Sequence, residues 1–179
     1  MGDPVNNARK EFEKYLKKWT ISGNRFLNGV DVGCGSSRID DMIVSLDQQA
    51  NYEFAHAQFV WDCKNLDLFA DEKLDFIFSS HCLEDFEDIP TVFCNWWKKL
   101  KVGGMMLLLL PDMEPDRYPK VGAPRGNPSH RTNTGKEFIL KMLDELKKSD
   151  RVVDYAVEQI DIIPHTECCS IDIAIRKVR

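Results

Sequence analysis

Short, nearly continuous apolar runs recur along the chain, separated by stretches that contain polar residues, glycine or aspartate. Such runs are typical of strands buried on both faces, as in a parallel sheet that is covered by helices. The segments predicted as strands are 26–32, 42–46, 59–61, 74–78, 105–110, 152–160 and 170–177. The last two follow each other without a helical segment between them, which favours an antiparallel pair at the edge of the sheet.

Three other segments have the periodicity of amphipathic helices, with apolar side chains three and four residues apart. An N-terminal helix is expected over 7–19. A second is expected over 91–100, because a lysine-rich last turn followed by Gly103 and Gly104 is typical of a helix C-terminus. A third is expected over 135–148, so helices and strands alternate along most of the chain.

This alternation predicts the α/β class: a Rossmann-like, doubly wound, mostly parallel seven-stranded sheet with an antiparallel last strand pair. The length fits a single domain, 1–179. The segment 111–134 is rich in proline and arginine and is too long for a simple connection. Loops of that length are usually functional or disordered.

Composition narrows the classes of partner. The chain is 43% hydrophobic, enough for one sizeable core, and its net charge of -5 disfavours nucleic acid as a partner. No run reaches the roughly 20 apolar residues of a membrane span, and the N-terminus lacks the apolar core of a signal peptide. The six cysteines include no C-x-x-C pair, so we expect no metal site and read them as reduced thiols of a cytoplasmic protein.

The stretch "VDVGCGSS" places two glycines, Gly33 and Gly35, directly after a predicted strand. In open parallel sheets, ligands bind beyond the carboxyl ends of the strands, where this turn is expected. The dinucleotide fingerprint requires a third glycine where this chain has Arg38, and the Gly-Lys-Ser/Thr of a phosphate loop is absent. A carboxylate at Asp31 repels a pyrophosphate but suits a ligand that carries an ammonium group.

Five stretches in chain order resemble motifs of the class I S-adenosylmethionine-dependent methyltransferases, in particular of their small type 11-like subgroup. They are "VDVGCGSS", "MIVSLD", "FVWDCKNLDLF", "LDFIFSSHCLEDF" and "WWKKLKVGGMMLLLLPD". The resemblance extends from about Gly29 to Asp112, and its spacing is more specific than the glycines alone. It implies a methyltransferase with S-adenosylmethionine as its cofactor.

The resemblance also implies which residues bind that cofactor. The candidates are Asp31, Gly33, Cys34, Gly35, Ser36, Asp47, Asp62, Cys63 and Ser80. Asp47 at the end of the second strand would accept hydrogen bonds from both ribose hydroxyls. Asp62 would face the adenine amino group, with Cys63 as a backbone contact, and Ser80 would face the methionine end of the cofactor.

Two histidines, His81 and His130, are the candidate catalytic bases. Methyl transfer is an in-line displacement at an activated carbon, so a base is needed only where the acceptor must lose a proton. His130 lies in the 111–134 loop, which we expect to close over the acceptor with Tyr118, Arg125, His130 and Arg131. The alternative for His81 is a structural role with hydrogen bonds to the backbone.

The acceptor expected from the sequence is a small molecule or a saccharide, methylated on oxygen or nitrogen. The turn after the fourth strand, "SSHC", lacks the prolines with which amino-methylating DNA enzymes receive their substrate. Two other interpretations stay open: a non-catalytic methyltransferase-like protein that binds the cofactor or a partner, and a nicotinamide-dependent oxidoreductase. Trp96 and Trp97 lie in a predicted helix, where core packing is the expected role.

Overall fold

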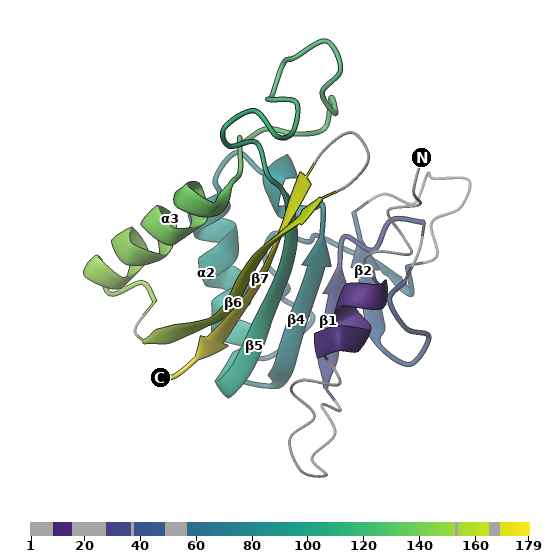
Figure 1. Cartoon of the computed structure of the whole chain (residues 1–179). Coiled ribbons are helices and arrows are strands. Elements are labelled where there is room, and N and C mark those ends of the chain that lie inside the picture. Colours follow the sequence, from purple (N-terminus) through teal and green to yellow (C-terminus); the bar gives the residue numbers. More distant parts are fainter. Residues whose placement is uncertain (1–8, 16–27, 37, 49–56, 153, 165–168) are drawn as a thin grey trace.

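The computed structural model describes residues 9–15, 28–36, 38–48, 57–152, 154–164 and 169–179 (Figure 1). Its strands are β1 Gly29–Val32, β2 Val44–Asp47, β3 Phe59–Val60, β4 Leu74–Ser80, β5 Leu100–Pro111, β6 Tyr155–Pro164 and β7 Cys169–Lys177. They form one seven-stranded sheet in the order β3-β2-β1-β4-β5-β7-β6.

The pairing of these strands confirms the predicted fold class. The four pairs among the first five strands are parallel, whereas β7 runs antiparallel to both β5 and β6. β1 lies between β2 and β4, so the strand order reverses at its carboxyl end. In open α/β sheets this reversal is where ligands bind, and it places the glycine turn there.

Helices lie on both faces of the sheet (Figure 1). α2, Ile89–Lys99, and α3, Lys136–Lys148, lie on one face, and the helical residues 9–15 lie on the other. A single-turn helix, η1 Leu83–Asp85, follows β4. Both long helices therefore fall within a few residues of their predicted bounds, whereas the expected N-terminal helix is described only over 9–15.

Alternation along β4 divides the core between the two faces. Ile77 belongs to the larger cluster, with Trp96 of α2, and Phe76 and Phe78 belong to the smaller one, with Phe12. The Phe12 ring lies 5.4 Å from that of Phe76 and 5.5 Å from that of Phe78. This period of two is what a strand buried on both faces requires.

The core role expected for Trp96 and Trp97 is confirmed. Trp96 is 0% and Trp97 3% exposed. The indole Nε1 of Trp96 donates to the Cys63 carbonyl at 2.7 Å, which ties α2 to the turn after β3. Buried tryptophans usually have such a partner for their N–H.

The helix-end signal at Gly103 and Gly104 was misplaced: α2 ends at Lys99, and both glycines lie inside β5. The register explains why they are there. Leu74 pairs with Leu100, but Phe76, two residues further, pairs with Met105, so β5 carries extra residues in a bulge. Gly103 has φ 83°, which only glycine adopts without strain, and a side chain at Gly104 would meet backbone oxygens.

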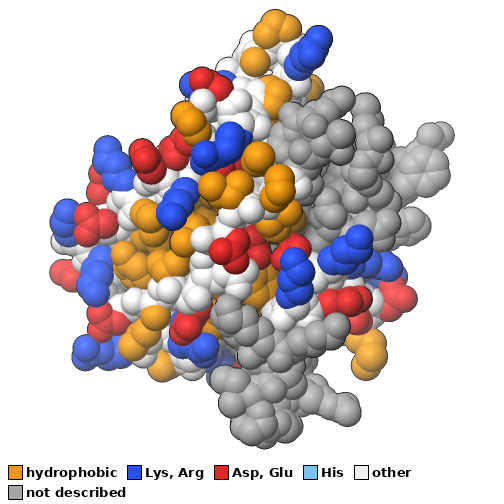
Figure 2. All heavy atoms as spheres, viewed as in Figure 1, with side chains coloured by type: hydrophobic (Ala, Val, Ile, Leu, Met, Phe, Trp, Pro, Cys, Tyr) orange, Lys and Arg blue, Asp and Glu red, His pale blue; other side chains and the backbone are white. Residues whose placement is uncertain are grey.

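The connection from β1 to β2 contains no helix in its described residues, 33–36 and 38–43. Ile39 of this connection instead packs into the smaller cluster with Phe12. The helical residues 9–15 thus take part of the surface that a crossover helix would cover. Acidic and basic side chains lie next to each other on this side of the molecule (Figure 2). Within the helical residues 9–15, Glu11 pairs with Lys14.

Candidate functional site

The glycine turn is held in place by β2 rather than by its own residues. The N–H groups of Gly33 and Cys34 both donate to the Leu46 carbonyl, at 2.9 and 3.1 Å. The N–H of Gly35 donates to Asp47 Oδ2 at 2.9 Å. Asp47 is 8% exposed, so a buried carboxylate fixes the turn from below.

The two glycines meet different surroundings. Both have positive φ, 72° at Gly33 and 54° at Gly35. A side chain at Gly33 would come within 2.4 Å of Cys82 after β4, whereas one at Gly35 would meet no described atom within 4 Å. Gly33 therefore permits close packing between neighbouring turns, and Gly35 borders open space where a ligand can approach the backbone.

Asp31 is a buried acidic residue within β1 itself. It is 2% exposed, and its Oδ2 accepts a hydrogen bond from Ile39 N at 3.0 Å. Burial, opposed by that hydrogen bond and reinforced by the nearby Asp47, raises the pKa of Asp31 to about 7. Two acidic groups held side by side under the glycine turn favour a cationic ligand, because a cation would stabilise both carboxylates.

The other two candidate residues of the glycine turn, Cys34 and Ser36, carry no charge. The thiol of Cys34 is half-buried, and burial followed by the charges of Asp31 and Asp47 raises its pKa to about 12, so it stays protonated. Ser36 is exposed. Neither side chain is therefore a charged group of the site.

Asp62 and Cys63 are engaged within the protein. Asp62 is exposed and accepts from Lys64 N at 2.8 Å and from Asn65 Nδ2 at 3.1 Å, which makes it the first residue of a turn. Cys63 is fully buried, and its carbonyl accepts from Trp96. Contacts of these two residues with a cofactor remain predictions.

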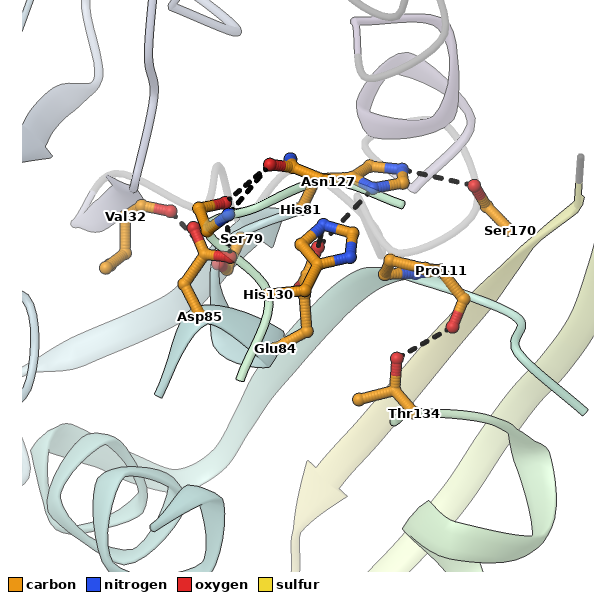
Figure 3. Close-up of polar contacts among 11 residues, drawn as sticks. Val32, Ser79, His81, Glu84, Asp85, Pro111, Asn127, His130, Thr134 and Ser170 are labelled. Atoms are coloured by element: carbon orange, nitrogen blue, oxygen red, sulfur yellow. Dashed lines mark hydrogen bonds and ion pairs between the residues drawn. The ribbon is translucent and has the colours of Figure 1, made fainter. Parts of the chain in front are cut away.

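The carboxyl end of β4 presents Ser80 and then His81, whose φ is 52°. Its N–H donates to the Leu109 carbonyl at 2.8 Å, which holds this uncommon backbone conformation. The His81 ring reaches Ser170 of β7 on one side, with Nε2 3.1 Å from Oγ, and Glu84 on the other, with Nδ1 3.5 Å from Oε1 (Figure 3). The turn therefore fixes the direction of the ring.

His130 approaches the same carboxylate from the loop. Its Nε2 lies 3.4 Å from Glu84 Oε1, and its side chain is 1% exposed. The loop is fixed to η1, because Arg131 N and Thr132 N donate to the Glu84 carbonyl at 2.9 and 3.1 Å. The structure thus brings together the two candidate bases through Glu84, which the sequence interpretation did not single out (Figure 3).

Further contacts close this end of the site. Ser129 Oγ donates to Asp85 Oδ1 at 2.8 Å. The ring of Tyr118 lies 6.4 Å from that of His81 and 5.7 Å from that of His130. Tyr118 and the residues 129–132 therefore pack against the turn after β4, whereas the side chains of Arg125 and Arg131 are exposed. Closure of the loop over an acceptor stays a prediction.

The strand order is that of a Rossmann-like α/β domain. The glycine turn and the two buried acids form a candidate ligand site at the point where the strand order reverses. Residues 30–108, from β1 into β5, match the family model described as a methyltransferase domain, type 11. This part of the chain is therefore similar to methyltransferase domains of the type 11 kind. A comparison with curated protein sequences gave no match.

Solved structures agree with the fold. An S-adenosylmethionine-dependent methyltransferase from Archaeoglobus fulgidus is 13% identical with a TM-score of 0.60, covering 94% of each chain. The 1,6-didemethyltoxoflavin-N1-methyltransferase of Burkholderia thailandensis, solved with its substrate and S-adenosylhomocysteine, is 13% identical with a TM-score of 0.64, covering 100% of this chain and 92% of that one.

A third similar chain comes from the Haloferax volcanii complex that contains the methyltransferase activator Trm112. It is 14% identical with a TM-score of 0.62, covering 98% of this chain and 96% of that one. At these identities the likeness shows the fold alone. None of the described helices is long and apolar enough to cross a membrane.

Proposed function

We propose that this protein transfers a methyl group from S-adenosylmethionine to oxygen or nitrogen of a small-molecule or saccharide-type acceptor. The observation that carries the proposal is the glycine turn with two buried carboxyl groups, Asp31 and Asp47, beside it. S-adenosylmethionine has a sulfonium and an ammonium group, and such a site complements a cation rather than a pyrophosphate. The methyltransferase family match over 30–108 supports the same choice.

The acceptor is proposed to lie between the glycine turn and the 111–134 loop. The similar Burkholderia structure is that of a 1,6-didemethyltoxoflavin-N1-methyltransferase with bound 1,6-didemethyltoxoflavin, which supports a small-molecule acceptor. The residues positioned for the acceptor here are Tyr118 from the loop and His81 from the turn after β4. Because methyl transfer is an in-line displacement, the main task of these groups is to hold the acceptor atom opposite the leaving sulfur.

His81 is the proposed base for an acceptor that must lose a proton. Its side chain is 29% exposed, whereas that of His130 is 1% exposed, so only His81 can reach a bound acceptor directly. Ser170 and Glu84 orient its ring from either side. His130 is then a positioning residue that packs behind Glu84.

Calorimetric titration tests the cofactor. We expect micromolar binding of S-adenosylmethionine, no binding of NAD, and loss of cofactor binding in Asp31→Ala. The matched control is Asp144→Ala, an exposed carboxylate on α3, which should bind like the wild type. Binding of NAD alone would instead favour the oxidoreductase interpretation, and binding of neither would refute the enzyme proposed here.

The His81 assignment is tested by turnover once an acceptor is found by screening. His81→Gln should lower kcat by about 10²- to 10⁴-fold for a hydroxyl acceptor and leave cofactor affinity unchanged. An unchanged kcat would remove His81 from the mechanism.

A non-catalytic relative is the second candidate, favoured by the connection between β1 and β2, which has no helix in its described residues. This interpretation expects cofactor binding without turnover on any acceptor in the screen. Methylation of one acceptor would exclude it.

A further inference from the structure

Glu84 is a buried acidic side chain in the turn after β4. It is 0% exposed, and neither of its carboxylate oxygens has a hydrogen-bond partner among the described residues. The Nδ1 atom of His130, itself 3% exposed, also has no partner in that part of the chain. Buried carboxylates are normally paired or coordinate a metal, since desolvation of an unpaired charge is costly.

The neighbours of Glu84 are metal-ligating groups. One ligand atom each from Glu84, Asp85 and His130 all lie within 4.8 Å of one another. His130 Nε2 lies 3.4 Å from Glu84 Oε1, longer than the roughly 2.7–2.9 Å of a charge-assisted hydrogen bond. Two ligands that each bind one ion at about 2.1 Å lie on the order of 3–3.5 Å apart, which is the separation seen here.

From this geometry we propose that Glu84, Asp85 and His130 bind a first-row divalent transition-metal ion, such as Mn²⁺, Co²⁺ or Zn²⁺. One imidazole and two carboxylates favour these ions over Mg²⁺ and Ca²⁺, which prefer oxygen ligands throughout. No metal-ligand spacing is visible in the sequence, because the ligands come from η1 and from the loop around His130. The site goes beyond the proposed methyl transfer and departs from the expectation of no metal.

Contacts around the three ligands support a built site. Ser129 Oγ donates to Asp85 Oδ1 at 2.8 Å, as an outer partner of a metal-bound carboxylate does. The backbone of Arg131 and Thr132 donates to the Glu84 carbonyl and fixes the loop against η1. Three protein ligands leave coordination positions open for water or for an oxygen atom of an acceptor.

The site also lies next to the glycine turn. Cys82, between His81 and Glu84 in the chain, is the residue that a side chain at Gly33 would strike. His81 approaches the same Glu84 oxygen at 3.5 Å, from the side of β7. An ion held by the three ligands would therefore sit on the acceptor side of the proposed cofactor site.

Metal titration tests the proposal without any cofactor or acceptor. The full chain, without a polyhistidine tag and after treatment with chelator, is titrated calorimetrically with Mn²⁺, Co²⁺, Zn²⁺ and Mg²⁺. We expect one Mn²⁺, Co²⁺ or Zn²⁺ ion per chain, bound at least tenfold more tightly than Mg²⁺. The visible spectrum of the Co²⁺ form reports coordination by nitrogen and oxygen.

The variants are Glu84→Gln and His130→Asn, each expected to weaken metal binding by at least about 100-fold. The matched control is Glu87→Gln, the same substitution at an exposed residue shortly after η1, which should bind like the wild type. Metal should raise the melting temperature of the wild type and of Glu87→Gln but not of Glu84→Gln.

Two results would overturn the proposal. One is the absence of stoichiometric metal binding by the wild type. The other is a folded Glu84→Gln variant, or His130→Asn if the former does not fold, that binds metal as the wild type does. S-adenosylmethionine binding is measured separately, so failure of the metal site and failure of the proposed methyl transfer are distinguishable.

Discussion

The substitution Asp31→Asn tests whether the buried carboxylate of Asp31 lowers the stability of the free protein while it favours binding of the cofactor. The Asp31 carboxylate is 2% exposed beside Asp47, and its pKa is raised to about 7 from the ordinary value of 3.8. Asn has nearly the same shape, and its carbonyl oxygen can still accept from Ile39 N. The substitution therefore removes the charge and keeps the packing.

The expected magnitude follows from linkage. A carboxyl group whose pKa is raised by folding stabilises the protein fully below pH 3.8, and this contribution is lost as the pH rises through about 7. The whole difference corresponds to about 4 kcal/mol at about 1.4 kcal/mol per pH unit. Roughly 3 kcal/mol of it falls between pH 5 and pH 8, the part that an experiment reaches easily.

Urea unfolding of the free protein at pH 5 and pH 8 measures the effect. The free energy of unfolding of Asp31→Asn minus that of the wild type should rise by about 3 kcal/mol between the two pH values. Asp172, whose pKa burial and the neighbouring Glu11 raise to about 7, titrates in both proteins and cancels in the difference. The exposed control Asp144→Asn should show no such change.

A constant difference between Asp31→Asn and the wild type across this pH range would refute the reasoning, because it would mean that Asp31 is ionised at little cost. Loss of S-adenosylmethionine binding in Asp31→Asn, together with its higher stability, would show that the Asp31 carboxylate serves cofactor binding rather than folding.

Three further predictions concern the same site and its support. Affinity for S-adenosylmethionine should rise from pH 6 to pH 8 in the wild type, since a cationic ligand favours ionised Asp31, and calorimetry should find this dependence gone in Asp31→Asn. Gly35→Ala should lower the free energy of unfolding only by the roughly 1–2 kcal/mol that a left-handed alanine costs, but it should weaken cofactor binding. Gly33→Ala should lower the free energy of unfolding further, because its side chain would also collide with Cys82. Equal losses in urea unfolding would contradict this difference. Trp96→Phe should destabilise the fold by about 1–3 kcal/mol through the unpaired Cys63 carbonyl, and by more through the cavity that the smaller ring leaves. A neutral result in urea unfolding would contradict both contributions.

The fold class could be predicted from the sequence because strands that are buried on both faces consist of nearly continuous apolar residues. The nearly continuous apolar run of β5 and the glycine turn after β1 depend on local chemistry, and so does the close succession of β6 and β7 at the end of the chain. The bounds of an element are mispredicted where the same residues are typical of two structures, here a helix end and a β-bulge. Gly103 and Gly104 were read as a helix end, although they permit a bulge within β5 that appears only once β4 is paired.

The candidate site divides in the same way. Asp31, Gly33, Gly35 and Asp47 could be selected from the sequence, because they lie at the carboxyl ends of β1 and β2, which are consecutive in the chain and adjacent in the sheet. Glu84 could not be selected in this way. Its contact with His130, a residue remote in the sequence, forms only because the loop returns to η1.

The sequence by itself therefore determined the class of fold, the position of the ligand turn and the acids beside it, all of which follow from periodicity and local backbone requirements. The tertiary structure alone decided that His81 and His130 meet at one buried carboxylate, and that Asp31 is deeply buried with a raised pKa. Burial and the distance between groups remote in the chain depend on packing, which no local pattern records.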